Sequence, residues 1–443
     1  MNIDEEYFNS EDFQELLSSY EESVESGLPM FLDADDFVDL ADYYSLNNED
    51  EKAENAIEHG LSIYPDDVLL NVFVARQALA EEDYEEASRI AERIADKDAP
   101  DYHYLMAEIL IAQNRIDEAD RYLRDIYLTV PQDEIQDYVK DVANLYVDYD
   151  VSEKAYEWML RSAGDNSDDF KELMARTLFG LGKYKDSQRL FNELLDNNPF
   201  SKHYWTALAA VQYMDEDYSA SVTSSEYAIA IDPEDPEGLM SKANGLLKLG
   251  DYEEAIEIFK KAIKPLKASH DEETLAHVYQ EMAFAYNALG QTEEALAMID
   301  KTDALPCDHV DMLVMRGHLL LSRQDIEGAE TFFRRAMSES DGDPDIVLRI
   351  IISLYDNRYV SASYHMLKRF LTDKTYKKCN RGHAYMVLCC YELGRDAECL
   401  QYLKTAIERN PTETRLTLSH LFPEGMPVKD YYNYLKDKLK IEI

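Results

Sequence analysis

Near the middle of the chain, residues 249–255 read Leu249-Gly250-Asp251-Tyr252-Glu253-Glu254-Ala255. Residues 237–249 before the turn place apolar side chains at helical spacing, and residues 252–263 after it do the same. Glycine and aspartate between the two patterns favour a turn. The stretch therefore predicts two consecutive helices joined by a tight connection.

This pattern recurs along the chain with a period close to 34 residues. A first column of small residues gives the register: Ala53, Ala87, Ala119, Ala155, Ser187, Ser221, Ala255, Ala295, Ala329, Ala362 and Cys399. A second column lies twelve residues earlier: Ala41, Ala75, Ala107, Ala143, Ala175, Ala209, Ala243, Ala283, Gly317, Ile350 and Val387. Prolines follow five members of the first column by twelve residues: Pro65, Pro131, Pro199, Pro233 and Pro411. The sequence is therefore built from repeats.

The small residues explain how each repeat folds. Ala243 on the first helix of a pair and Ala255 on the second let the two backbones approach closely, while Phe259 fills the space around that contact. Proline ends the second helix because it lacks the amide donor and clashes with the preceding turn. One hairpin cannot bury its apolar face, but stacked hairpins can, so the pattern predicts a solenoid.

The repeats resemble those of the tetratricopeptide repeat (TPR) family, in the multi-repeat form found in bacterial proteins. Its inter-helix signature is matched at residues 83–87, 181–187, 249–255 and 289–295, and Trp205, Leu208 and Ala209 fall where its pattern expects them. The resemblance covers residues 34–411. It implies an all-α fold, a right-handed α-solenoid (superhelix) of about eleven helix-turn-helix units with terminal capping helices.

Three parts of the chain follow from this register. Residues 1–33 are expected to form an acidic N-terminal cap, residues 34–411 the solenoid, and residues 412–443 a C-terminal capping helix. One interval of the first column is 40 residues long. Its extra residues, near 264–273, predict either longer helices or a hinge between two sub-solenoids. The last helix has a second interpretation, as an autoinhibitor that occupies an acidic groove through Lys429, Lys436, Lys438 and Lys440.

The charge of the chain excludes several functions. With 90 acidic and 44 basic residues the net charge is −46, and the first 100 residues alone carry −24, whereas residues 343–443 carry +3. Nucleic-acid binding needs basic side chains that neutralise phosphates, and anionic membrane surfaces repel acidic proteins in the same way. An apolar content of 46% supplies material for a core. A folded protein that binds no nucleic acid is expected.

The sequence also predicts a cytoplasmic location without direct membrane insertion. The N-terminus has no basic residue before Lys52 and no apolar segment of the kind that a secretory signal needs. No run of about 18 apolar residues is present to span a bilayer. The five cysteines are too few for a disulfide scaffold in a chain of this length.

No catalytic, cofactor-binding or metal-binding residues are predicted, and the protein is not expected to be an enzyme. The repeats leave no room for a separate catalytic domain, and phosphate-binding glycine loops, nucleophile elbows and HExxH are all missing. Cys379, Cys389, Cys390 and Cys399 cluster in sequence, but their spacings of ten, one and nine do not suit zinc. We expect them to be buried packing residues.

In the TPR family the first helices line a concave surface that receives an extended peptide or a partner helix. Acids recur on the corresponding helices here: Asp35, Asp42, Asp101, Glu108, Asp137, Asp169, Glu237 and Asp311. Acids in a first turn also favour the positive end of the helix dipole, so both interpretations stay open. The groove residues that we predict are Asp35, Asp42, Asp101, Glu108, Asp137, Lys140, Asn144 and Arg176.

One subclass of the family grips a C-terminal carboxylate with a set of Lys, Asn and Arg residues. Lys140 and Asn144 match its opening pair, but Leu173 stands where the next Asn is needed, and His203 and Ala207 replace the final Lys and Arg. Without those donors the bidentate grip fails. We therefore do not expect this chain to bind in that way.

The function expected from the sequence is a non-enzymatic scaffold or adaptor that binds a basic peptide or helix in an acidic concave groove. Seventeen acidic and no basic residues in positions 1–51 motivate the choice of a basic partner. Two alternatives remain. The chain is either a structural self-assembly protein, or an accessory subunit that presents substrate to a separate enzyme.

Overall fold

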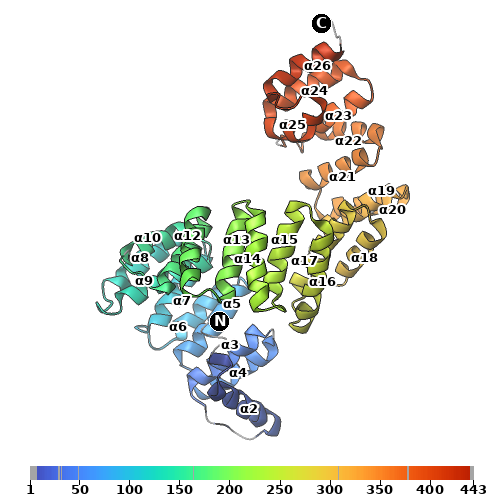
Figure 1. Cartoon of the computed structure of the whole chain (residues 1–443). Coiled ribbons are helices and arrows are strands. Elements are labelled where there is room, and N and C mark those ends of the chain that lie inside the picture. The colour runs from blue at the N-terminus through green and yellow to red at the C-terminus, as the bar shows by residue number, and fades with distance from the viewer. Residues whose placement is uncertain are drawn as a thin grey trace. The chain divides into compact units, whose positions relative to one another are not determined.

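The computed structural model describes residues 7–27, 30, 32–47, 49–162, 164–307, 309–376 and 379–439 (Figure 1). These residues form α-helices and three short 3-10 helices, with no strand among them. The chain divides into two compact units, Met1–Leu275 and Ala276–Ile443, and the boundary falls within helix α17. Across the described ranges the helices form eleven consecutive pairs, from α3 and α4 to α23 and α24, so the fold is an all-α solenoid.

The first unit contains one leading helix and then seven pairs, which follow one another in space in the order of the sequence (Figure 1). Its helices are α2 (Glu11–Ser26), α3 (Ala34–Leu46), α4 (Asp50–Ile63), α5 (Val68–Ala80), α6 (Tyr84–Arg93), α7 (Pro100–Ala112), α8 (Ile116–Tyr127), α9 (Ile135–Asp148), α10 (Ser152–Met159), η1 (Leu160–Ser162), α11 (Asp168–Gly180), α12 (Tyr184–Asn197), α13 (Lys202–Met214), α14 (Tyr218–Ile231), α15 (Pro236–Leu249) and α16 (Tyr252–Ala268).

The second unit continues the pairs and ends in shorter elements. Its helices are α17 (Glu272–Ala288), α18 (Thr292–Thr302), α19 (Val310–Ser322), α20 (Ile326–Glu339), α21 (Pro344–Asp356), α22 (Val360–Thr372), α23 (His383–Glu392), α24 (Asp396–Arg409), α25 (Pro411–Leu418), η2 (Ser419–Leu421), η3 (Val428–Asp430) and α26 (Tyr431–Leu439).

The two columns of small residues lie where the helices of a pair cross. Ala175 on α11 and Ser187 on α12 are both fully buried, as are the corresponding Ala209 and Ser221 of the next pair. The hydroxyl groups of Ser187 and Ser221 each donate to the carbonyl oxygen of the alanine twelve residues earlier, both at 2.8 Å. A serine therefore fits this position because its polar atom is satisfied inside the crossing.

The predicted register of the tenth repeat is wrong by one residue. Ala362 is exposed, while Ser363 is fully buried and its hydroxyl donates to the carbonyl oxygen of Ile351 at 3.1 Å. Ile351 and Ser363, rather than Ile350 and Ala362, are the members of the two columns. The pattern of hydroxyl bonding settles this, because it repeats the geometry of Ser187 and Ser221.

The extra residues of the long repeat interval are absorbed into two helices. Helices α16 and α17 are 17 residues each, longer than any other helix in the described ranges. Of the two alternatives that the sequence left open, the structure shows the longer helices. The hinge near residues 264–273 stays a prediction.

Both ends of the repeat array are covered by additional helices. Phe13 and Tyr20 of α2 are buried against Phe37 of α3. At the other end Tyr431 and Leu435 of α26 enter the core of the second unit. The sequence did not predict α25. The packing of α26 is what a terminal cap requires, and the autoinhibitory interpretation stays a prediction; Lys440, which it also uses, lies outside the described residues.

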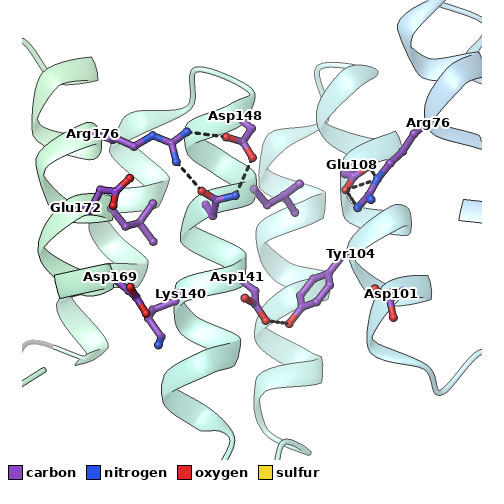
Figure 2. Close-up of a pocket in the computed structure, with 13 residues that line it drawn as sticks. Arg76, Asp101, Tyr104, Glu108, Lys140, Asp141, Asp148, Asp169, Glu172 and Arg176 are labelled. Atoms are coloured by element: carbon purple, nitrogen blue, oxygen red, sulfur yellow. Dashed lines mark hydrogen bonds and ion pairs between the residues drawn. The ribbon is translucent and has the colours of Figure 1, made fainter. Parts of the chain in front are cut away.

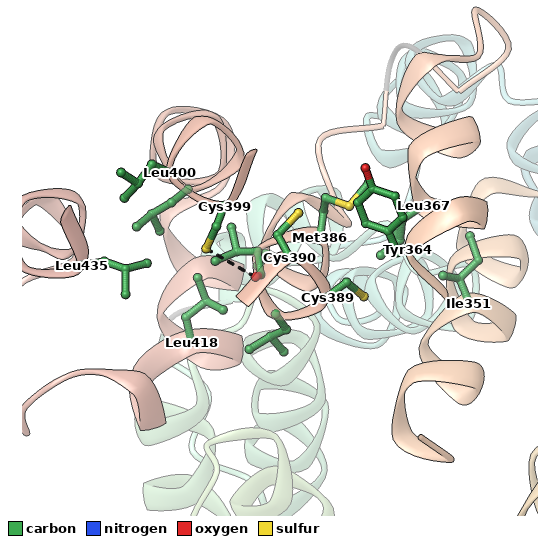
Figure 3. Packing of buried hydrophobic residues seen from close by; sticks show 14 of the residues in the cluster. Ile351, Tyr364, Leu367, Met386, Cys389, Cys390, Cys399, Leu400, Leu418 and Leu435 are labelled. Atoms are coloured by element: carbon green, nitrogen blue, oxygen red, sulfur yellow. Dashed lines mark hydrogen bonds between the residues drawn. The ribbon is translucent and has the colours of Figure 1, made fainter. Parts of the chain in front are cut away.

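Three of the four clustered cysteines pack in the core of the second unit (Figure 3), whereas Cys379 is only partly buried and packs against its edge, so the prediction of burial is wrong for that residue. Cys389, Cys390 and Cys399 are fully buried, and the Cys399 thiol lies 3.7 Å from the carbonyl oxygen of Val387, at the same crossing position as the serines. Burial raises the pKa of Cys389 to about 11 and those of Cys390 and Cys399 to about 12. These side chains therefore stay protonated thiols and act as small apolar residues.

The crossing position gives a direct test of the packing. A Cβ atom on Gly317 would lie 2.3 Å from the ring of Phe333 on the paired helix. We expect Gly317→Ala to lower the free energy of unfolding of the second unit by about 1–3 kcal/mol, because an aromatic ring cannot yield that space without strain. Denaturant unfolding measures the change. Gly164→Ala is the control, since a Cβ there meets no atom within 4 Å; equal stability losses in the two variants would contradict the account.

His383 should make the second unit sensitive to acid. Its side chain is 6% exposed and Nδ1 has no hydrogen-bond partner in the described structure. Burial, helped by Arg409, lowers the pKa from 6.5 to about 4. Because the unfolded chain then binds the proton first, stability falls as the pH drops from 6.5 to 4 and levels off below, by at most about 3 kcal/mol.

Thermal unfolding between these pH values checks the effect. His383→Gln should flatten that part of the pH profile while leaving the rest unchanged. A variant profile that is parallel to the wild-type profile would show that His383 does not cause the dependence.

Candidate binding groove

Four consecutive first helices, α5, α7, α9 and α11, line a groove of about 530 Å³ in the first unit (Figure 2). Its walls carry six acidic and three basic side chains, and the apolar side chains of Leu145 and Leu173 also line it. The lining residues are Arg76, Asp101, Tyr104, Glu108, Lys140, Asp141, Asn144, Leu145, Asp148, Asp169, Glu172, Leu173 and Arg176. The groove is therefore strongly polar, with an excess of acid.

Four of these residues share one position in the repeat. Arg76, Glu108, Asn144 and Arg176 each follow directly after a buried alanine of the second column. The alanine faces the paired helix, and the next side chain is turned by about 100° around the helix. The close packing of each pair therefore decides which side chain enters the groove.

One end of the groove holds a bidentate ion pair. The guanidinium of Arg76 donates to both carboxylate oxygens of Glu108, at 2.6–3.2 Å. Glu108 is 5% exposed, so its charge is compensated by this arginine. The hydrogen bond to Glu108 raises the pKa of Arg76, against the opposing effect of burial. Glu108 is thus a paired structural acid rather than an open binding group.

The other end of the groove holds a closed triangle of polar side chains. Arg176 donates to the Asn144 side-chain oxygen and to the Asp148 carboxylate, both at 2.9 Å. The Asn144 amide nitrogen in turn donates to Asp148 at 2.8 Å. These contacts lie at the upper edge of the groove in Figure 2, in line with the pair of Arg76 and Glu108. The donors of Arg176 that face Asn144 and Asp148 are therefore already occupied.

A row of carboxylates lies below these pairs in Figure 2: Asp101 on α7, Asp141 on α9 and Asp169 on α11. Asp141 accepts a hydrogen bond from Tyr104 at 2.9 Å. Desolvation raises its pKa, and the neighbouring charges of Asp137 and Asp101 add to the rise. Within the described ranges Asp101 and Asp169 form no hydrogen bond or ion pair through their side chains. These carboxylates remain open to a ligand.

Two more charged groups border the row. Lys140 lies 2.9 Å from Asp137 of the same helix, in an ion pair that keeps its charge beside the groove. Glu172 contacts His203 of α13 at 2.8 Å. Burial would raise the pKa of Glu172, but the hydrogen bonds with His203 and Tyr204 outweigh it and lower the pKa. Glu172 is therefore held ionised at the end of the row.

The structure brings together five of the eight predicted groove residues: Asp101, Glu108, Lys140, Asn144 and Arg176. Asp137 borders the groove through Lys140. Asp35 and Asp42 are exposed on α3, away from the lining of this groove. Sequence reasoning missed Arg76, Tyr104, Asp141, Asp148 and Glu172. The signal for Arg76 was its place directly after Ala75 of the second column.

Comparison with known families identifies the repeats. Family models described as tetratricopeptide repeat match residues 78–139, 173–236, 237–264 and 281–301. These segments of the chain are tetratricopeptide repeats. Repeats of this family generally serve protein–protein interaction and are typically non-catalytic. None of the helices in the described ranges combines the length and apolar run that a membrane crossing requires.

Several solved structures resemble this chain. A tetratricopeptide repeat protein from Parabacteroides merdae is 15% identical, with a TM-score of 0.43 over 57% of this chain and 97% of that one. A chain of the APC/C hetero-tetramer Cut9–Hcn1 is 14% identical, with a TM-score of 0.41, over 88% of this chain and 76% of that one. The pilF protein of Pseudomonas aeruginosa is 15% identical, with a TM-score of 0.40, over 48% of this chain and 94% of that one. The search of curated proteins gave no match.

The ion pair at the end of the groove predicts an asymmetry between two variants. Arg76→Met leaves the buried carboxylate of Glu108 without a partner, whereas Glu108→Met leaves an arginine that is 52% exposed and can reach water. We expect Arg76→Met to destabilise α5 and α7 by about 1–3 kcal/mol and Glu108→Met by less.

Hydrogen exchange of the α5 and α7 amides measures both changes. The double variant Arg76→Met/Glu108→Met should recover most of the loss. If Glu108→Met proves the more damaging change, the pair does not serve to neutralise a buried acid.

Proposed function

We propose that the protein is a non-enzymatic interaction scaffold that binds a basic segment of a partner protein in the groove of α5, α7, α9 and α11. The proposal rests on one observation: the basic side chains of the groove are paired with neighbours, whereas some of its acidic side chains are not. Both arginines are held by neighbouring side chains, whereas the carboxylates of Asp101 and Asp169 are open. A cationic ligand can enter without breaking an existing pair.

An anionic ligand would meet a different situation. To bind a carboxylate, Arg176 would have to leave Asp148 and Asn144, and Arg76 would have to leave the buried Glu108. Lys140 is already paired with Asp137. In each case the free energy lost by breaking the existing pair is about as large as the free energy gained from the new one. An anionic ligand therefore gains little, and the groove favours positive charge.

The wider charge distribution supports the same partner. The first 100 residues carry −24, and this field extends beyond the groove itself. Such a field raises the rate at which a basic segment reaches the surface, and salt weakens it. The proposal also includes the cytoplasmic location that the sequence predicts.

A peptide of repeated arginines provides a direct probe. We expect the triple variant Asp101→Asn/Asp141→Asn/Asp169→Asn to weaken binding of this peptide by about tenfold, because three exposed charge pairs of up to about 1 kcal/mol each are lost. Isothermal titration calorimetry measures the affinity, and the wild-type affinity should fall as salt is raised.

A matched control removes the same charge from the second helices. Asp117, Glu153 and Asp186 lie in the first turns of α8, α10 and α12 and are exposed. The variant Asp117→Asn/Glu153→Gln/Asp186→Asn should bind almost as the wild type does. If both triple variants weaken binding equally, net charge rather than the groove holds the peptide; if the wild type does not bind it at all, the proposed function fails.

A further inference from the structure

The outward side of helix α14 carries almost no charge. Its 14 residues include one charged side chain, Glu226, whereas the second helices of the neighbouring pairs, α12 and α16, carry five and seven. Glu226 is neutralised by Lys242 of α15, whose Nζ lies 2.9 Å from the carboxylate. A helix that faces solvent normally keeps charged residues on its outer side, and a helix without them is typically covered. The composition of α14 therefore indicates a contact surface.

The exposed residues of α14 lie on one side of the helix, which we call the α14 face. They are Ser219, Thr223, Glu226, Tyr227, Ala230 and Ile231, and the partly exposed Ala220 lies among them. At about 100° per residue these positions span roughly 140° of the helix circumference. The N-terminal half of the face holds small side chains, whereas the C-terminal half adds the large side chains of Tyr227 and Ile231.

Aromatic side chains extend the large half of the face onto α13. Tyr227 is 53% exposed, and its ring stacks on that of Trp205 with the ring centres 4.4 Å apart. The indole nitrogen of Trp205 donates to the carbonyl oxygen of Pro199 at 2.9 Å, which fixes the orientation of the ring. Phe200, directly before the N-cap of α13, is 80% exposed. The cores of protein interfaces are enriched in aromatic residues and depleted of charged ones, and this surface has both properties.

The net charge of the protein limits what can cover this surface. A basic partner gains nothing from a face without free carboxylates and is attracted to the acidic groove instead. Two copies of the chain, at −46 each, repel each other wherever their acidic surfaces meet. Contact between two α14 faces brings almost no charge together. A second copy can therefore approach here with little local repulsion.

The α14 face is also complementary to itself. In a dimer with two-fold symmetry the same surface is used on both copies. When α14 of one copy packs antiparallel on α14 of the other, the large half of each face lies over the small half of the other. Tyr227 then lies over Thr223 of the second copy, and Ile231 lies over Ser219 and Ala220 of the second copy. The small residues let the helices approach closely, and the large ones fill the remaining space.

We propose that the protein forms a symmetric dimer in which the α14 faces of two copies pack antiparallel, flanked by Trp205 and Phe200. This dimer does not depend on the proposed function. The groove is lined by first helices, whereas α14 is a second helix, so the grooves of both copies stay open. The dimer presents two grooves, which raises the affinity for a partner that carries two basic segments.

The size of the face sets the strength of the dimer. Helix α14 is about 21 Å long, so its face is smaller than the roughly 800 Å² per partner of a stable interface. We expect a reversible dimer with a Kd of about 10–100 µM. Salt should strengthen it, because screening weakens the repulsion between two acidic copies. An assembly in which a basic end contacts an acidic end would instead weaken with salt, so the salt dependence separates the two arrangements.

A glutamate in the middle of the face tests the contact. In Thr223→Glu, sedimentation equilibrium of the full chain should show self-association weakened by at least about tenfold, because the new charge is buried against Tyr227 of the second copy. Thr331→Glu on α20 is the matched control and should associate as the wild type does. Both threonines are exposed, follow a buried residue of the first column by two positions, and donate to the carbonyl oxygen four residues earlier at 3.0 Å. Circular dichroism checks that both variants keep the helical content of the wild type.

A mixture of two variants tests whether both copies use the same face. Thr223→Lys alone should also weaken self-association. Mixed with Thr223→Glu, it should restore association to within about threefold of the wild type, because opposite charges then meet near the two-fold axis. If the α14 face docked on a different surface of the second copy, the mixture would show no rescue, and the symmetric dimer would be wrong.

The remaining outcomes decide whether the dimer exists. A wild-type chain that stays monomeric up to about 300 µM in high salt would overturn the proposal. So would an association that Thr223→Glu leaves unchanged, or an equal loss in Thr223→Glu and Thr331→Glu. None of these results would affect the proposed function, because a peptide can bind in the groove of a single copy.

Discussion

Every helix pair in this structure is held by the close approach of its two helices at a small side chain. Ala175 of α11 meets Ser187 of α12 with both side chains fully buried, and the serine hydroxyl bonds to the alanine carbonyl. Because this contact fixes the rotation of the first helix, it also fixes that the next residue, Arg176, faces the groove. The packing of a pair and the chemistry of the groove are therefore two results of one crossing.

Much of the fold could be predicted because periodicity is a property of the sequence itself. Eleven helix pairs follow from the columns of small residues, and the error in the tenth repeat arose because Ala362 looks like the better small residue than Ser363. Only the hydrogen bond to Ile351 reveals why serine is accepted there. Helix α25 was missed because it is eight residues long and is followed by a segment rich in proline and glycine.

The groove could be predicted only in part, because its chemistry depends on which side chains meet across repeats. Glu108 was predicted as a groove acid, yet Arg76 of the preceding repeat neutralises it. The contact between these two residues crosses from one repeat to the next and cannot be seen in the sequence alone. Asp141 was missed because its place in the groove, beside Tyr104 of the preceding repeat, does not follow from any pattern of acids in the sequence.

The net charge of −46 does not say which acids are open to a ligand, because some of them, such as Glu108, are paired with a basic side chain. Photo-crosslinking in cells of the source organism tests most directly whether partners bind in the groove. A photo-crosslinking amino acid replaces Asp169 in the groove or, as a matched position, Asp186 on α12 of the same repeat. We predict that partners are captured from position 169 through basic segments, and that position 186 captures few or none. Capture from position 186 alone, or capture of acidic segments at position 169, would contradict it.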